Sequence, residues 1–204
     1  MKRDDEKVLM ILQFQTHKLV YHWRLFIQLY GSKKENVEVM KAVAGEFFGI
    51  VQKLLWDDVL LSIGKLTDPP KNSAQENISI ENAIDRLGAV LGEKAVVDLR
   101  KQLKDLKEKC GLIKKIRHKR LAHNDKDYSF LGLDKGPLPG EKRNNVQAIL
   151  DLIKKIINGI EMGFGVSRVL YDMETHTVGE ALIWYLEKCG SFRQVRERDR
   201  AGKR

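Results

Sequence analysis

Two histidines and a run of bases crowd one short stretch of the sequence, residues 116–125, which reads IRHKRLAHND. Cleavage of an RNA phosphodiester without a metal requires a base near the 2′-hydroxyl, an acid at the leaving oxygen and a cation over the phosphate. Histidine takes and gives protons near neutral pH, and arginine stays charged and grips two phosphate oxygens with its planar fork. Arg117 and His123 are the residues of this stretch whose types and spacing fit such chemistry.

The same stretch also has a purely structural interpretation. Bases at the end of a helix complement the negative end of its dipole, and Asn124 suits a left-handed cap. On an ideal helix, the spacing of Arg117 and His123 places them about 120° apart, so that they flank a groove. A two-fold partner can complete such a groove, because an isologous interface brings each motif to its own copy. The residues by themselves leave both interpretations open.

The elements that must position this stretch are expected to be long helices. All four prolines fall in two places, 69–70 and 137–139, and no sustained alternation of apolar and polar residues indicates a strand. We therefore predict an all-α fold, an antiparallel bundle of about five to six helices. The expected helices cover residues 4–30, 35–66, 80–91, 93–123 with a kink or break at Gly111, 144–172 and 178–188.

Two local signals refine this expectation. Ser79 is a good N-cap for the helix over 80–91, and Gly92 suits its end. In the helix over 35–66, one apolar stripe is expected to face the core, and the carboxylate of Asp58 falls on it. The main members of that stripe are Val39, Val43, Phe47, Ile50, Leu54 and Leu61.

Length and charge set the domain organisation that we expect. A chain of 204 residues with 43% apolar residues suits a single helical domain, here residues 1–190, followed by a basic tail over 191–204. The formal net charge is +9, and the tail, expected to be flexible, contributes six bases and two acids. A basic balance favours polyanionic partners such as nucleic acid, and the alternative is a tail that only adds solubility.

Other classes of function find little support in the sequence. The two cysteines form no CxxC or Cys/His spacing. His17 and His22 have no third metal ligand at a suitable spacing in the sequence, so we expect neither a metal nor another cofactor. No apolar run is long enough to cross a bilayer, and the start carries acids where a signal peptide would carry only bases. We expect a cytoplasmic protein with no membrane partner.

Three stretches resemble, in the same order, the AbiU-type branch of the HEPN superfamily. They read YHWRLFIQLYG, LLWDDVLLSIGKLTDPP and IRHKRLAHND. The spacing R-x-x-x-x-x-H within RHKRLAH also matches the arginine and histidine signature of that superfamily. The resemblance covers about residues 5–170 and leaves out the basic tail.

The resemblance implies a helical homodimer whose paired motifs form a metal-independent endoribonuclease site, as in toxins and abortive-infection effectors of phage defence. RNA, single-stranded or tRNA, would be the substrate. The resemblance casts Arg117 as the clamp on the phosphate and transition state and His123 as the proton-transfer group. Further candidates, as RNA contacts or as supports of this pair, are Asp58, His118, Lys119, Arg120, Asn124 and Asp125.

Asp58 and His118 bear most directly on how such a site would work. Asp58 is the preferred acid to orient Arg117 or His123, whereas Asp68 lies in Thr67-Asp68-Pro69, which is good turn chemistry. His118 stands where the family commonly has a polar residue such as asparagine. That difference supports an alternative, a non-catalytic RNA-binding or regulatory HEPN domain.

A third alternative is a toxin controlled by a partner antitoxin, for example a nucleotidyltransferase that modifies a tyrosine after the family histidine. Asp125 holds the second position after His123, and Tyr128 comes later, which disfavours that mode of control.

Overall fold

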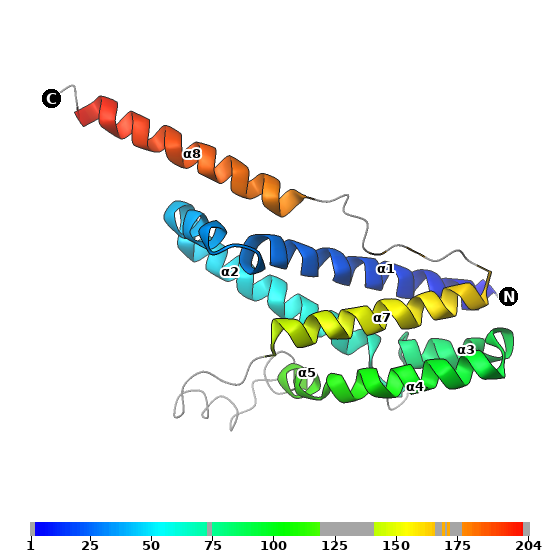
Figure 1. Cartoon of the computed structure of the whole chain (residues 1–204). Helices are drawn as coiled ribbons and strands as arrows, with labels where there is room; N and C mark the ends of the chain where they lie inside the picture. Colours follow the sequence, from blue (N-terminus) through cyan, green and yellow to red (C-terminus); the bar gives the residue numbers. More distant parts are fainter. Residues whose placement is uncertain are drawn as a thin grey trace, which may run out of the picture. The chain divides into compact units, whose positions relative to one another are not determined.

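The structure is a computed structural model of the chain (Figure 1). It describes side chains as far as Cys189, and the described residues are 3–72, 75–118, 141–165, 169, 171 and 177–201. The loop expected over 124–140 therefore lies outside the described residues.

Helices make up nearly all of the described chain. They are α1 (Arg3–Phe26), the π-helix η1 (Ile27–Gly31), α2 (Lys34–Leu66), α3 (Ile80–Leu91), α4 (Glu93–Lys109), α5 (Gly111–Ile116), α7 (Arg143–Gly163) and α8 (Val178–Ala201). Two short strands, β1 (Lys71–Asn72) and β2 (Gln75–Glu76), pair antiparallel between α2 and α3. The predicted all-α class is confirmed. The described residues contain seven α-helices rather than five or six, because the backbone leaves helical geometry at Cys110 and separates α4 from α5.

The chain divides into two compact units. The first unit comprises residues 1–20 and 59–171, and the second comprises residues 21–58 and 172–204. Each unit has its own buried side chains, and the candidate stretch begins within the first.

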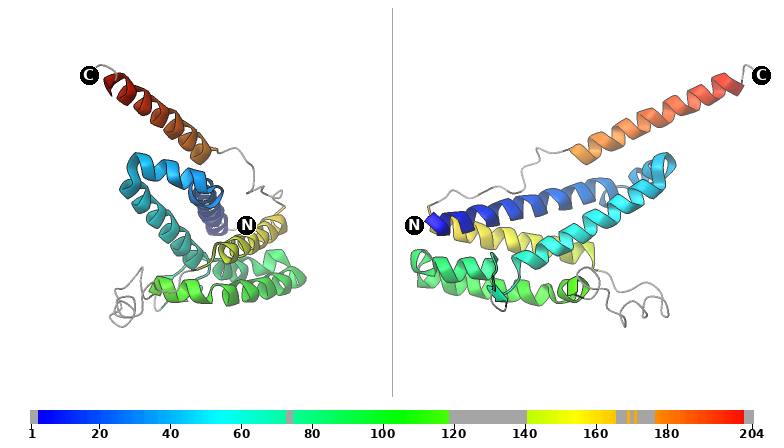
Figure 2. Two further views of the ribbon diagram at one scale, coloured as in Figure 1. Left: turned by 60° about the vertical axis from the view of Figure 1, so that its left-hand side comes forward. Right: turned by 180° about the vertical axis from the view of Figure 1, so that it is seen from behind.

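The first unit is built around α3, α4 and α7, which pack against one another (Figure 2). Consecutive helices of this group run in opposite directions, as the short connections between α3 and α4 require (Figure 1). Ser79 caps α3 as predicted, because its Oγ accepts a hydrogen bond from the backbone N–H of Asn82 at 3.3 Å. Gly92 ends the same helix with a φ of +81°, a conformation that favours glycine. The core takes large side chains that are fully buried, among them Ile63, Leu66, Ile84, Leu87, Leu106, Ile113, Ile153 and Ile156.

The second unit has a smaller core. Leu29 of η1, Met40 and Phe48 of α2 and Ile183 of α8 form its buried apolar cluster. The backbone N–H of Gly179 donates to the side-chain oxygen of Gln28 at 3.0 Å, which fixes the start of α8 beside η1. Aromatic rings extend this packing, since the Phe26 ring lies 5.1 Å from the Trp56 ring.

One predicted core face was wrong. Phe47, Ile50 and Leu54 of α2 are exposed, and the second unit buries Met40 and Phe48 instead. The helix is apolar on two faces, so its periodicity could not tell which face the core would take. In addition, the backbone of Ala44 is not helical, with a φ of −158° and a ψ of 64°, which changes the phase of the stripe at that point.

Two helix ends also differ from expectation. The helix expected to reach residue 172 ends at Gly163, because the chain leaves the helix at Phe164 and Gly165 takes a φ of +71°. The helix expected to end near residue 188 continues to Ala201, so most of the basic tail has a helical backbone. Within the described residues, no helix combines the length and the apolar character that a membrane span needs.

Candidate functional site

The structure describes the arginine end of the candidate motif. Arg117 and His118 continue α5 as the start of a wider helical turn. His123 and the neighbouring candidates fall outside the described residues; they are Lys119, Arg120, Asn124 and Asp125. The described part of the candidate site is therefore Arg117 and its surroundings in the first unit.

An ion pair holds the guanidinium of Arg117. Its Nη2 lies 2.7 Å from Oδ1 of Asp68, and the two side chains are 28% and 23% exposed. Asp68 follows the last turn of α2, where its backbone N–H donates to the carbonyl of Lys65. The turn chemistry predicted for Thr67-Asp68-Pro69 thus presents a carboxylate to the start of the motif. A pair at this distance is a charge-assisted hydrogen bond that fixes the orientation of the arginine plane.

Gly64 provides the space in which this arginine lies. A Cβ at that position would come within 2.7 Å of Cδ and 2.8 Å of Nη1 of Arg117. The arginine side chain therefore rests directly against the backbone of the last turn of α2. Gly64 lies in the last turn of α2 and Asp68 in the turn that follows it, so Arg117 contacts the end of the helix at two places.

A buried contact anchors α5 on this helix end. Cys110 and Thr67 are both buried and are joined by a side-chain hydrogen bond, and the Thr67 hydroxyl also donates to the Ile63 carbonyl at 2.9 Å. Burial raises the pKa of the Cys110 thiol to about 11, against the opposing charge of Lys114 and the Thr67 hydrogen bond. The thiol is thus protonated and serves in packing. Cys110 directly precedes α5 and Arg117 directly follows it, so the anchor and the arginine stand at the two ends of this short helix.

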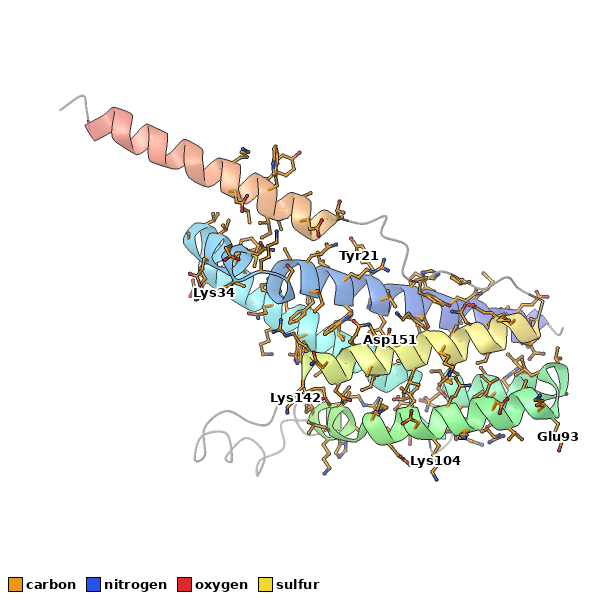
Figure 3. The ribbon with its side chains drawn as sticks, in the orientation of Figure 1. Tyr21, Lys34, Glu93, Lys104, Lys142 and Asp151 are labelled. Atoms are coloured by element: carbon orange, nitrogen blue, oxygen red, sulfur yellow. The ribbon has the colours of Figure 1, made fainter. Side chains whose placement is uncertain are left out.

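Basic residues lie next to Arg117 in the sequence and at the start of α7. We define the basic edge as Lys114, Lys115, Arg117, His118, Lys142 and Arg143. The start of α7 lies beside α4 and α5, since the Asn145 side chain donates to the Lys109 carbonyl at 3.3 Å (Figure 3). The basic edge therefore combines the end of α5 with the start of α7, on both sides of residues 119–140. Such a concentration of positive charge attracts phosphate backbones.

The acid that pairs with Arg117 is not the one that the sequence favoured. Asp58 belongs to the second unit, where its Oδ2 lies 2.7 Å from Nδ1 of His22. Neighbouring Asp57 pairs with Lys53 at 2.9 Å. Asp68, and not Asp58, is therefore the acid that pairs with Arg117, and an orienting role of Asp58 toward His123 stays a prediction. Asp68 takes this role because α2 ends and turns beside α5, a proximity that no local pattern in the sequence reports.

The N-terminal histidines have contacts of a structural kind. The His17 ring lies 4.6 Å from the Tyr171 ring, tilted by 46°, and His22 pairs with Asp58. Across the part of the chain that the structure describes, no three His, Cys, Asp or Glu side chains gather as a metal site would require.

The family model described as AbiU2, of the HEPN type, matches residues 8–182, which include most of α1, the whole of α5 and Arg117. No curated protein and no solved structure matches the chain.

Proposed function

The chain belongs to the AbiU2 family of HEPN domains, and on that premise we propose that it is a metal-independent endoribonuclease of an abortive-infection system. Arg117 would bind the scissile phosphate, and His123 would transfer protons. RNA, single-stranded or tRNA, would be the substrate, and a second copy of the chain would complete the site.

The main support for this proposal is the fixed position of Arg117. Asp68 holds one nitrogen of the Arg117 guanidinium, and the contact with Gly64 holds its stem. Among the described residues, Asp68 is the one acid paired with this arginine. The rest of the planar fork remains for phosphate oxygens, and a cation fixed in advance loses little freedom when the negative charge develops. An arginine that served only to cap α5 would not need both the ion pair with Asp68 and the close contact with Gly64.

The reaction follows from these groups. One imidazole removes the proton of the 2′-hydroxyl, whose oxygen attacks the phosphorus while the bond to the 5′-oxygen breaks. A second, protonated imidazole gives its proton to that leaving oxygen, so the products are a 2′,3′-cyclic phosphate and a 5′-hydroxyl end. Two imidazoles are available when His123 comes from each of two copies.

The test is cleavage of labelled single-stranded RNA and tRNA by the purified protein in the presence of EDTA. We expect cleavage that leaves 5′-hydroxyl ends, and we expect none from His123→Ala prepared in parallel, which controls for a contaminating nuclease. Equal cleavage by both proteins, or none by either at any concentration, would contradict the proposal.

A second prediction concerns Asp68. Asp68→Asn keeps the shape of the side chain but removes its charge, so we expect kcat to fall about tenfold because Arg117 is oriented less firmly. RNA affinity should stay the same or rise, because the basic edge loses a neighbouring negative charge. A purely structural role would instead lower the melting temperature and leave kcat unchanged. The matched control is Asp85→Asn, which removes the acid paired at 2.8 Å with Arg100 of α4.

The basic edge also favours a second candidate function, RNA binding without cleavage. Lys115, His118 and Lys142 are exposed side chains of that edge. Under this alternative, Lys115→Ala and Lys142→Ala would weaken RNA binding and flatten its dependence on salt, with no cleavage to lose.

A further inference from the structure

Two large aromatic rings on α8 face water. Trp184 is 53% exposed and Tyr185 is 61% exposed, whereas Trp23 in the same unit is buried. The two ring centroids lie 4.9 Å apart, with the ring planes at 81° to each other. Packing or a partner normally removes the apolar surface of a tryptophan from water, so an exposed one points to a binding surface. We call Trp184 and Tyr185 the aromatic pair.

The rest of α8 holds the aromatic pair in place. Ile183 is buried in the core of the second unit, and Leu186 packs against the same core. The Gly179 N–H donates to the side-chain oxygen of Gln28 at 3.0 Å, and a Cβ at Gly179 would lie 2.8 Å from that oxygen. The start of α8 therefore packs closely on η1. Because the helix is anchored, it can present its two exposed rings to a ligand with little loss of conformational freedom.

Positive charge accompanies the aromatic pair. The Lys188 ammonium lies 5.6 Å from the centroid of the Trp184 ring, a cation–π contact between residues four apart on the helix. From Val178, where α8 starts, to the end of the chain, the sequence has seven bases and four acids. The helical backbone continues to Ala201, so the basic end of the chain extends directly from the helix that carries the rings.

We infer that the aromatic pair binds single-stranded RNA, with unpaired bases stacked on Trp184 and Tyr185 and the phosphate backbone beside Lys188 and the basic end of the chain. Proteins that hold single strands combine the same two features, aromatic faces for the bases and positive charge for the backbone. Every base has a π-face, so such a surface binds RNA without reading its sequence. The choice of RNA rests on the proposed function, whereas the stacking surface rests on the contacts of α8.

A lipid surface is the other partner to which a helix with aromatic and basic residues can bind. A helix that lies in the lipid interface needs a continuous apolar face. In α8, Ile183 and Leu186 are taken up by the core of the second unit. The exposed residues next to the rings include Glu180, Glu187 and Lys188. Charges of both signs interrupt the apolar face that a bilayer requires, so the single strand is the better match.

The first experiment titrates labelled oligouridine with the full chain, carrying His123→Ala so that the RNA stays intact. Trp184→Ala in this parent should raise the dissociation constant about tenfold or more, the usual effect of losing one stacked base. The factor should be the same at every salt concentration, because stacking releases no counterions. Trp184→Phe keeps a ring and should bind within a few-fold of the parent. Lys188→Ala should instead reduce the slope of log affinity against log salt by about 0.7.

The matched control is Phe14→Ala on α1, which removes an aromatic ring that is 70% exposed and should leave the affinity unchanged. Neither ring of the aromatic pair belongs to the core, so Trp184→Ala should keep the helix content and melting temperature of the parent. If Trp184→Ala binds oligouridine as tightly as the parent, or if Phe14→Ala weakens binding as much, the inference is overturned.

The second experiment replaces oligouridine with an RNA duplex of the same length. Bases within a duplex are stacked on one another and are not free to stack on protein rings. Trp184→Ala should therefore bind the duplex as tightly as the parent does. An equal loss of affinity for both RNAs would contradict stacking. Binding to vesicles of anionic phospholipid that depends on Trp184, with no effect of Trp184 on oligouridine, would assign the surface to a membrane and overturn the inference.

These measurements are separate from the test of the endoribonuclease, because they record binding and not cleavage. If the chain with His123 intact cleaves no RNA, the proposed function fails, and the loss of oligouridine affinity in Trp184→Ala would still support the aromatic pair. If the chain cleaves RNA and Trp184→Ala has unchanged affinity, the proposed function stands and the aromatic pair is not an RNA-binding surface.

Discussion

Replacing Arg117 with alanine is expected to lower kcat for RNA cleavage about 100-fold or more, the usual effect of removing one fixed group that stabilises transition-state charge. We expect the rest of the basic edge to share phosphate binding in the ground state, so RNA affinity should fall only several-fold. The ion pair with Asp68 is partly exposed, and its loss should change the melting temperature little. Single-turnover cleavage of labelled RNA, with a separate binding titration, measures the two effects independently.

Two further variants sharpen this test. Arg100→Ala removes an arginine that is also paired with an aspartate, but on α4, and should leave kcat unchanged. Arg117→Lys keeps the charge and loses the planar fork, so its kcat should fall between those of wild type and Arg117→Ala. If Arg117→Ala and Arg100→Ala weaken cleavage equally, Arg117 contributes only general positive charge and is not the phosphate clamp.

The parts of this fold that sequence predicts best are those set by local chemistry. Ser79 and Gly92 mark the two ends of α3 because a cap and a positive φ depend on one or two residues. The kink or break predicted at Gly111 also depends on adjacent residues, and α4 and α5 separate at Cys110. Each signal lies in adjacent residues and needs no knowledge of what packs nearby.

The candidate site could be predicted only in part, because its geometry depends on packing between helices far apart in sequence. Arg117 stands out by its type and spacing, but the acid that pairs with it depends on where α2 ends against α5. Asp58 and Asp68 are both acids in a stretch that resembles the family, and only the fold distinguishes them. The prediction that the face of α2 with Phe47 is buried was wrong for a related reason. An exposed apolar stripe and a buried one have the same period in the sequence.

Gly64→Ala is expected to lower kcat about 100-fold although it adds a single methyl group outside the motif. The new Cβ would lie 2.7 Å from Cδ and 2.8 Å from Nη1 of Arg117, so the guanidinium must move away from the helix and from Asp68. A displacement of about 1 Å at a catalytic group costs a factor of this size when the reaction depends on orientation. RNA affinity should change little, because the charge of Arg117 remains in the basic edge. Single-turnover cleavage and a binding titration again separate the two quantities.

The same helix offers a matched control for this substitution. A Cβ at Gly49 meets nothing within 4 Å, so Gly49→Ala should leave cleavage unchanged. Because alanine favours the helix, that variant should also be more stable by about 0.5–1 kcal/mol, as thermal unfolding would show. Gly64→Ala gains the same helical preference but removes the space in which the Arg117 side chain lies. A lower kcat with an undiminished melting temperature would therefore show that Gly64 acts by positioning Arg117. If Gly64→Ala cleaves RNA as fast as Gly49→Ala, Arg117 can act from another position, and its contact with α2 has no part in the chemistry.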